Sequence, residues 1–195
     1  MPTSKPNSRT SGRQRAQPAD AYALARRKYL AGQRIDLGQL AEELGVNRVT
    51  LYRWVGSRDV LLVEVIWRLT EETLTREWEK LANVRGPRVP RMLGAYLRDT
   101  MSQPGARHFL VTENERAMRL FTLASHGFQP RFLAAVRYYL SLDIETGRIS
   151  SPLAVDDLAY VTVRIAESYQ YLPTIAGAAP DPDTAERVLT ALLRA

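Results

Sequence analysis

Hydrophobic and polar residues follow each other along this chain with the spacing of amphipathic helices, and no segment keeps the two-residue alternation typical of a strand. In residues 155–172, for example, apolar side chains recur every three or four positions from Leu158 to Leu172. Glycine and proline interrupt the pattern between such segments. The pattern predicts an all-α protein with helices over about residues 20–31, 37–44, 48–54, 58–81, 90–101, 107–125, 130–145, 155–172 and 183–193.

The composition is that of an ordinary globular chain, with 195 residues of which 45% are hydrophobic and 25% are charged. Cysteine is absent, which excludes a disulfide scaffold, a thiolate nucleophile and a cysteine-based zinc site. No apolar run approaches the roughly 18 residues that span a bilayer, and the N-terminus has no hydrophobic leader pattern. We therefore expect no membrane partner and a cytoplasmic location.

The positive charge is unevenly distributed. The formal net charge is +6, and residues 1–18 and 19–58 carry net charges of +4 and +3, whereas residues 59–195 carry −1. Residues 1–18 are also rich in serine, proline and arginine, so we expect a disordered basic arm. Such an arm alone is compatible with a solubility segment, but a basic arm joined to a basic folded segment favours a polyanion such as nucleic acid.

Two short predicted helices, 37–44 and 48–54, are separated by Gly45 and Val46 and have the proportions of a helix-turn-helix. Asp36 and Asn47 are suited to cap them. Apolar residues would fix the angle between the two helices and let the second project into a major groove. Its outward side chains would be Arg48, Thr50, Tyr52 and Arg53. The same geometry also serves simply to pack small helical domains, but the surrounding positive charge favours DNA.

Residues 40–62, LAEELGVNRVTLYRWVGSRDVLL, resemble the DNA-binding signature of the TetR family of transcriptional regulators. The resemblance implies that Thr50 and Tyr52 contact the DNA backbone and groove and that Arg58 binds a phosphate at the start of the fourth helix. With the residues chosen from their outward position, the candidate DNA-binding residues are Asn47, Arg48, Thr50, Tyr52, Arg53 and Arg58. The segments YRWVG at 52–56 and LAYVTVRIAE at 158–167 are similar to the QsdR-like branch, which implies repression of genes that degrade quorum-sensing lactones.

The family resemblance implies that the helices after the fourth form an effector pocket and that the last two pair with a second subunit. We therefore expect three parts: the arm 1–18, a DNA-binding domain with its linking helix over 19–81, and an effector-binding and dimerisation domain over 82–195. The apolar faces of 155–172 and 183–193 fit a homodimer, since one recognition helix rarely supplies enough specificity. They could also pack only within one chain.

Aromatic residues and isolated polar residues inside apolar helices supply the candidate ligand contacts, because a buried charge requires a partner. These candidates are Phe109, Glu113, Asn114, Tyr138, Arg164 and Glu167. The aromatic ones could be plain core, and Arg164 and Glu167, three positions apart, could simply pair along one helix face. An apolar pocket with few polar anchors suits an acyl chain with a polar head, such as an acyl-lactone.

Enzyme motifs are absent from the sequence: there is no nucleophile elbow, no phosphate-binding glycine loop and no zinc histidine motif. We expect no catalytic residue, no metal and no cofactor. The sequence favours a ligand-responsive regulator that binds double-stranded operator DNA, most simply a repressor released by a small effector. The alternative is a helical adaptor without sequence-specific DNA binding.

Overall fold

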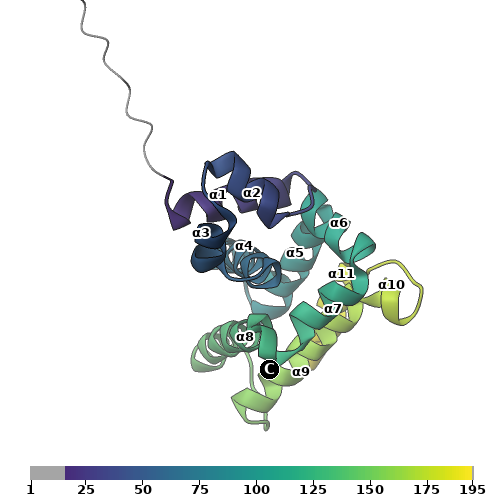
Figure 1. Ribbon diagram of the computed structural model, residues 1–195. Coiled ribbons are helices and arrows are strands. Elements are labelled where there is room, and N and C mark those ends of the chain that lie inside the picture. Colours follow the sequence, from purple (N-terminus) through teal and green to yellow (C-terminus); the bar gives the residue numbers. More distant parts are fainter. Residues whose placement is uncertain (1–15, 195) are drawn as a thin grey trace, which may run out of the picture.

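The computed structural model of the protein describes residues 16–194, and every regular element in that part of the chain is a helix (Figure 1). This confirms the all-α fold class. The predicted arm falls outside the described residues up to residue 15, and the first helix already begins at Pro18. In chain order the elements are α1 (Pro18–Leu30), α2 (Leu37–Leu44), α3 (Arg48–Val55), α4 (Arg58–Lys80), α5 (Val89–Ser102), α6 (Pro104–Thr112), α7 (Asn114–Thr122), the 3₁₀ turn η1 (Ala124–His126), α8 (Phe128–Glu145), α9 (Val155–Gln170), α10 (Leu172–Ile175) and α11 (Pro182–Leu192).

Local side-chain caps set where α2, α3 and α4 begin. Asp36 accepts a hydrogen bond from the Gln39 N–H at 3.0 Å, and Asn47 accepts one from the Thr50 N–H at 2.7 Å. Ser57 accepts one from the Val60 N–H at 3.2 Å. Each bond satisfies a donor that the first turn of a helix leaves free. Gly45 ends α2 with φ of 67°, a left-handed conformation that favours glycine, and so allows the sharp turn into α3.

The predicted helix over 107–125 is wrong as a single element, because α6 and α7 are separate helices that meet at Glu113. The backbone there leaves the helical region, with φ of −121° and ψ of 40°. Helix α6 also begins earlier than predicted, since proline is well tolerated at the first position of a helix. Gly105 lies directly against the backbone of Tyr29 in α1, where any side chain would collide.

Helix α4 lies near the middle of the molecule in Figure 1, between the first three helices and the later ones. It packs against α1, α5 and α8, while α9 packs against α8 and α11. Buried apolar residues form one cluster that extends from Ala21 in α1 to Leu193 after α11. The helices that follow α4, called the body below, are therefore joined to α4 by packed side chains. Within residues 16–194 no helix combines the length and apolarity required to cross a bilayer.

Candidate DNA-binding site and internal cavity

The candidate recognition helix α3 is anchored by one fully buried residue and exposes one face to solvent. Leu51 is fully buried, as is Leu40 of the neighbouring α2, so these two side chains hold the helix pair together. Tyr52 is 54% exposed, and Arg48 and Arg53 are also exposed, whereas Thr50 is partly covered. The outward face of α3 thus offers two cations and two hydroxyls, the groups that bind phosphate oxygens and base edges.

Arg48 does not extend freely from α3. Its guanidinium lies over Gly38 in the first turn of α2, so close that a Cβ at Gly38 would be 2.6 Å from Nη2. The pKa of the Asp36 carboxyl is lowered, mainly by the Gln39 N–H and further by the charge of Arg48. Glycine at position 38 therefore makes room for the Arg48 side chain between the two helices of the motif.

Arg58, at the first position of α4, is bound on two sides. Its Nε donates to the carbonyl oxygen of Ile35 at 2.7 Å. Its Nη1 and Nη2 donate to the two carboxylate oxygens of Glu113 at 2.8 and 2.6 Å. The pair is largely buried, and hydrogen bonds from Arg58 and then Arg116 lower the pKa of Glu113 to about 2. A phosphate contact by Arg58 would require this pair to open.

Two further ion pairs, both formed by Asp59, reinforce the same junction. Asp59 lies 3.2 Å from Nε of Arg116 and 3.9 Å from Nη2 of Arg119, both on α7. The start of α4 follows α3 after only two residues, and Glu113 is the residue at which α6 and α7 meet. These charged groups therefore fasten the segment behind the recognition helix to two helices of the body.

A narrow cavity of about 30 Å³ lies in the body between α4 and α9. Its wall contains aromatic rings, threonines and two carboxyl side chains, Asp99 on α5 and Glu167 on α9. Burial raises the pKa of Glu167 to about 7, against the opposing influence of Arg164. The lining residues are Tyr29, Ile66, Leu69, Thr70, Thr73, Tyr96, Asp99, Thr100, Gln103, Ala106, Leu110, Phe121, Phe128, Phe132, Glu167, Gln170 and Tyr171.

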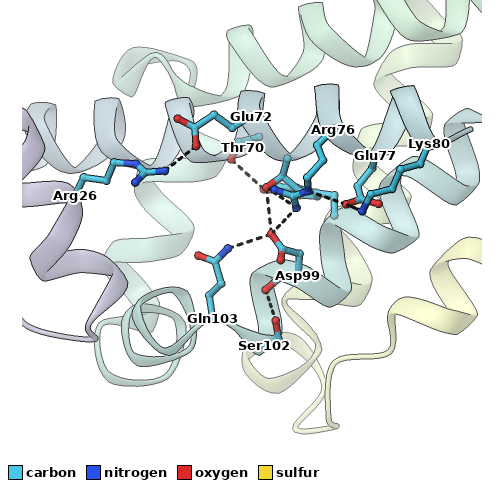
Figure 2. Close-up of polar contacts among 11 residues, drawn as sticks. Arg26, Thr70, Glu72, Arg76, Glu77, Lys80, Asp99, Ser102 and Gln103 are labelled. Atoms are coloured by element: carbon cyan, nitrogen blue, oxygen red, sulfur yellow. Dashed lines mark hydrogen bonds and ion pairs between the residues drawn. The ribbon is translucent and has the colours of Figure 1, made fainter.

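Polar contacts on one side of the cavity hold α4 and α5 together, as Figure 2 shows. The Asp99 carboxylate accepts hydrogen bonds from Thr73 at 3.1 Å and from Gln103 at 3.0 Å. It also accepts a longer one from Arg76 at 3.4 Å. The Asp99 carboxylate is therefore held in place at the cavity wall by two groups from α4 and by Gln103, which directly follows α5.

The structure places the candidate ligand residues in different environments. Of the six, only Glu167 lines the cavity. Phe109 is buried behind it, with its ring 5.8 Å from that of Phe121, and Glu113 belongs to the junction with Arg58. Asn114 is exposed at the start of α7, and Tyr138 is 59% exposed on α8. Arg164 reaches the cavity only indirectly, through its ion pair with Glu167.

Sequence reasoning missed Tyr96, Asp99 and Thr100, the polar cavity residues contributed by α5. The sequence signal that could have drawn attention to Asp99 is its position, two residues after the buried Leu97. Periodicity predicted a helix over about 90–101 but did not indicate which of its residues border an empty space, because a cavity is formed by several helices together.

The outer faces of α9 and α11 carry exposed apolar side chains. Tyr160 and Val161 on α9 are 55% and 36% exposed, and Val188 and Leu192 on α11 are 37% and 43% exposed. Since α9 and α11 pack against each other, these residues offer a nonpolar surface formed by two adjacent helices.

A helix-turn-helix with an exposed recognition helix, fastened to a helical body that encloses a cavity, defines a class of DNA-binding regulators of transcription. The chain belongs to the TetR family within that class: residues 86–194 match the family described as tetracyclin repressor-like, C-terminal domain. No curated protein sequence gives a significant match to the chain.

Solved structures support this assignment. The TetR-family transcriptional repressor QsdR from R. erythropolis is 29% identical and has a TM-score of 0.78, with 90% of this chain and 93% of that one covered. The repressor AlkX from Dietzia sp. strain DQ12-45-1b, implicated in biodegradation of n-alkanes, is 20% identical with a TM-score of 0.61, covering 91% and 94%. A putative TetR-family regulator from Rhodococcus sp. is 18% identical with a TM-score of 0.54, covering 89% and 92%. The chain is thus similar to QsdR over nearly the whole length of both proteins, and the other two structures show the shared fold.

Proposed function

We propose that this protein is a homodimeric repressor that binds operator DNA through α3 and leaves it when a small apolar or amphiphilic effector enters the cavity. The observation that carries the proposal is the exposure of Tyr52, Arg48 and Arg53 around the buried anchor Leu51. Tyr52 and Arg53 are exposed to solvent, so packing of the domain does not account for their positions. The proposed DNA contacts are Asn47, Arg48, Thr50, Tyr52 and Arg53, with Arg58 joining them where its pair with Glu113 opens.

We propose that DNA binding and effector binding are carried out by different parts of the chain. Residues 19–81 would read the DNA, in the cytoplasm where a bacterial operator lies, and residues 82–195 would bind the effector and the second subunit. The nonpolar surface on α9 and α11 supports the dimer, which would place two recognition helices on half-sites about one DNA turn, roughly 34 Å, or a multiple apart.

The size of the cavity supports a switch. Pockets for small molecules commonly measure about 300–1,000 Å³. The cavity here is only about 30 Å³, so a ligand must push the lining helices apart. Helices α6 and α7 contribute Ala106, Leu110 and Phe121 to its wall and are tied to the start of α4 through Glu113. Ligand entry would therefore pull on the segment directly behind α3.

An acyl-lactone is the effector that we propose to test first. Its acyl tail suits the aromatic wall of the cavity, and the protein is similar to QsdR. The experiment measures binding to DNA from the protein's own upstream region, with and without the lactone, by gel shift. We expect a sequence-specific shift that the lactone abolishes; a coupling of about 1–3 kcal/mol corresponds to a 5–150-fold loss of affinity. An adaptor protein would show no specific shift, and a shift that resists saturating lactone would exclude lactones as inducers.

A further inference from the structure

The charged side chains that face the cavity all have the same sign. Among the described residues that line it, the only formally charged ones are Asp99 and Glu167, and no lysine, arginine or histidine joins them. Glu167 comes from α9 and Asp99 from α5, so acidic groups border the space on two helices. An arriving ligand therefore meets carboxyl oxygens as the charged partners for its head group.

The arginines that pair with these two carboxyl groups do not line the cavity. Glu167 pairs with Arg164, whose side chain is 34% exposed and which is not part of the lining. Asp99 lies 3.4 Å from Arg76, whose side chain is 48% exposed. Because Arg76 is partly in solvent, a cationic ligand can replace it at Asp99 without leaving a guanidinium buried and unpaired. Nε and Nη2 of Arg164 are buried, so at Glu167 a cationic ligand would join Arg164 rather than replace it.

The aromatic wall favours the same sign of ligand charge. Phe121 and Phe128 have ring centroids 4.8 Å apart, Phe128 and Phe132 are 5.8 Å apart, and Tyr96 is 5.4 Å from Phe132. Ring faces carry negative electrostatic potential and attract cations and N–H donors. They offer a carboxylate no compensation for the water that it would lose.

We infer that the cavity selects apolar molecules whose head group is a nitrogen that donates hydrogen bonds, above all a protonated amine, and rejects molecules with a carboxylate head. The inference rests on the proposed function only in taking this cavity as the effector site. For a lactone effector it means that the neutral N-acyl form binds, whereas the ring-opened carboxylate does not.

Three ligands of equal chain length test the selection: decylamine, decanamide and decanoate, each below its aggregation concentration, titrated into the full-length protein by calorimetry. We expect decylamine and decanamide to bind and decanoate to bind at least about tenfold more weakly than decylamine. Glu167→Gln and Asp99→Asn, each with the circular dichroism of the parent, should each narrow the gap in affinity between decylamine and decanoate. Asp183→Asn, which removes an exposed carboxylate paired with Arg98 outside the cavity, should leave the gap unchanged.

Decanoate binding as tightly as decylamine to the parent protein would overturn the inference alone. The inference would also be overturned if neither Glu167→Gln nor Asp99→Asn narrowed the gap in affinity between decylamine and decanoate. Absence of binding by all three ligands would overturn both the inference and the assignment of the cavity as effector site. The gel shift without ligand is independent of these titrations, so DNA binding by α3 stands or falls separately.

Discussion

Arg58 donates two hydrogen bonds of 2.8 and 2.6 Å to the carboxylate of Glu113, although 55 positions separate the two residues in the chain. Arg58 opens α4, two residues after the recognition helix, and Glu113 marks the break between α6 and α7. Because α6 and α7 also border the cavity, this one pair joins the proposed effector site to the proposed DNA-reading helix.

Glu113→Gln should destabilise the protein by roughly 1–3 kcal/mol at neutral pH, because Arg58 loses its charged partner. The pKa of Glu113 is lowered from 4.5 to about 2, so its contribution is complete above about pH 4.5 and disappears as the pH falls toward 2. Urea unfolding of parent and variant at several pH values measures this difference, which should shrink under acid. Asp156→Asn, in an exposed pair with Arg137, is the control and should change stability by less than about 1 kcal/mol.

Glu167→Gln should show the opposite pH dependence. Burial raises the pKa of Glu167 from 4.5 to about 7, so the folded parent loses stability as the pH rises through that range. One pKa unit corresponds to about 1.4 kcal/mol, which sets the maximum loss at about 3 kcal/mol. Relative to the parent, the glutamine variant should be more stable at about pH 8 than at about pH 5. A difference in unfolding free energy between the two proteins that stays constant from about pH 5 to about pH 8 would contradict the raised pKa of Glu167.

Gly38→Ala should separate stability from DNA binding. Alanine favours a helix over glycine by up to about 1 kcal/mol, which would stabilise α2, but its Cβ would displace the Arg48 guanidinium. We expect weaker operator binding in Gly38→Ala than in the parent. In an Arg48→Ala background, where no guanidinium remains to be displaced, Gly38→Ala should cost no further affinity. A similar loss in both backgrounds, measured by fluorescence anisotropy, would show that Arg48 is not the residue affected.

Tyr160→Glu and Val188→Glu should each convert the proposed dimer into monomers, because a carboxylate on the nonpolar surface of α9 and α11 would be buried without a partner. Sedimentation velocity measures the change. Tyr138→Glu introduces the same charge at a site on α8 that is 59% exposed, and it should leave the sedimentation coefficient unchanged. A parent protein that already sediments as a monomer at micromolar concentration would refute the dimer.

The parts of the fold that depend on neighbouring residues were predictable. Asp36, Asn47 and Ser57 act three residues along the chain, so the starts of α2, α3 and α4 follow from the sequence. The parts that depend on distant residues were not. Nothing local to Glu113 indicates that Arg58 lies beside it, and no glycine or proline marks the break between α6 and α7.

The candidate residues divide in the same way. The exposed positions of α3 follow from helical periodicity around Leu51, which is a local property. Membership of the cavity wall depends on how α4, α5, α8 and α9 meet, and of the predicted ligand residues only Glu167 lies there. Whether these residues contact DNA and ligand stays a prediction.

The measurement that tests the central claim most directly is the affinity of the full-length protein for its operator, by fluorescence anisotropy, in the parent and in Tyr52→Ala and Arg53→Ala. Both side chains are exposed on α3, so the variants should fold like the parent in circular dichroism. We predict that each loses roughly 1–3 kcal/mol of operator binding, or about 5–150-fold in affinity, whereas Tyr138→Ala loses none. Operator binding by both α3 variants with the affinity of the parent would contradict the claim that this helix reads DNA.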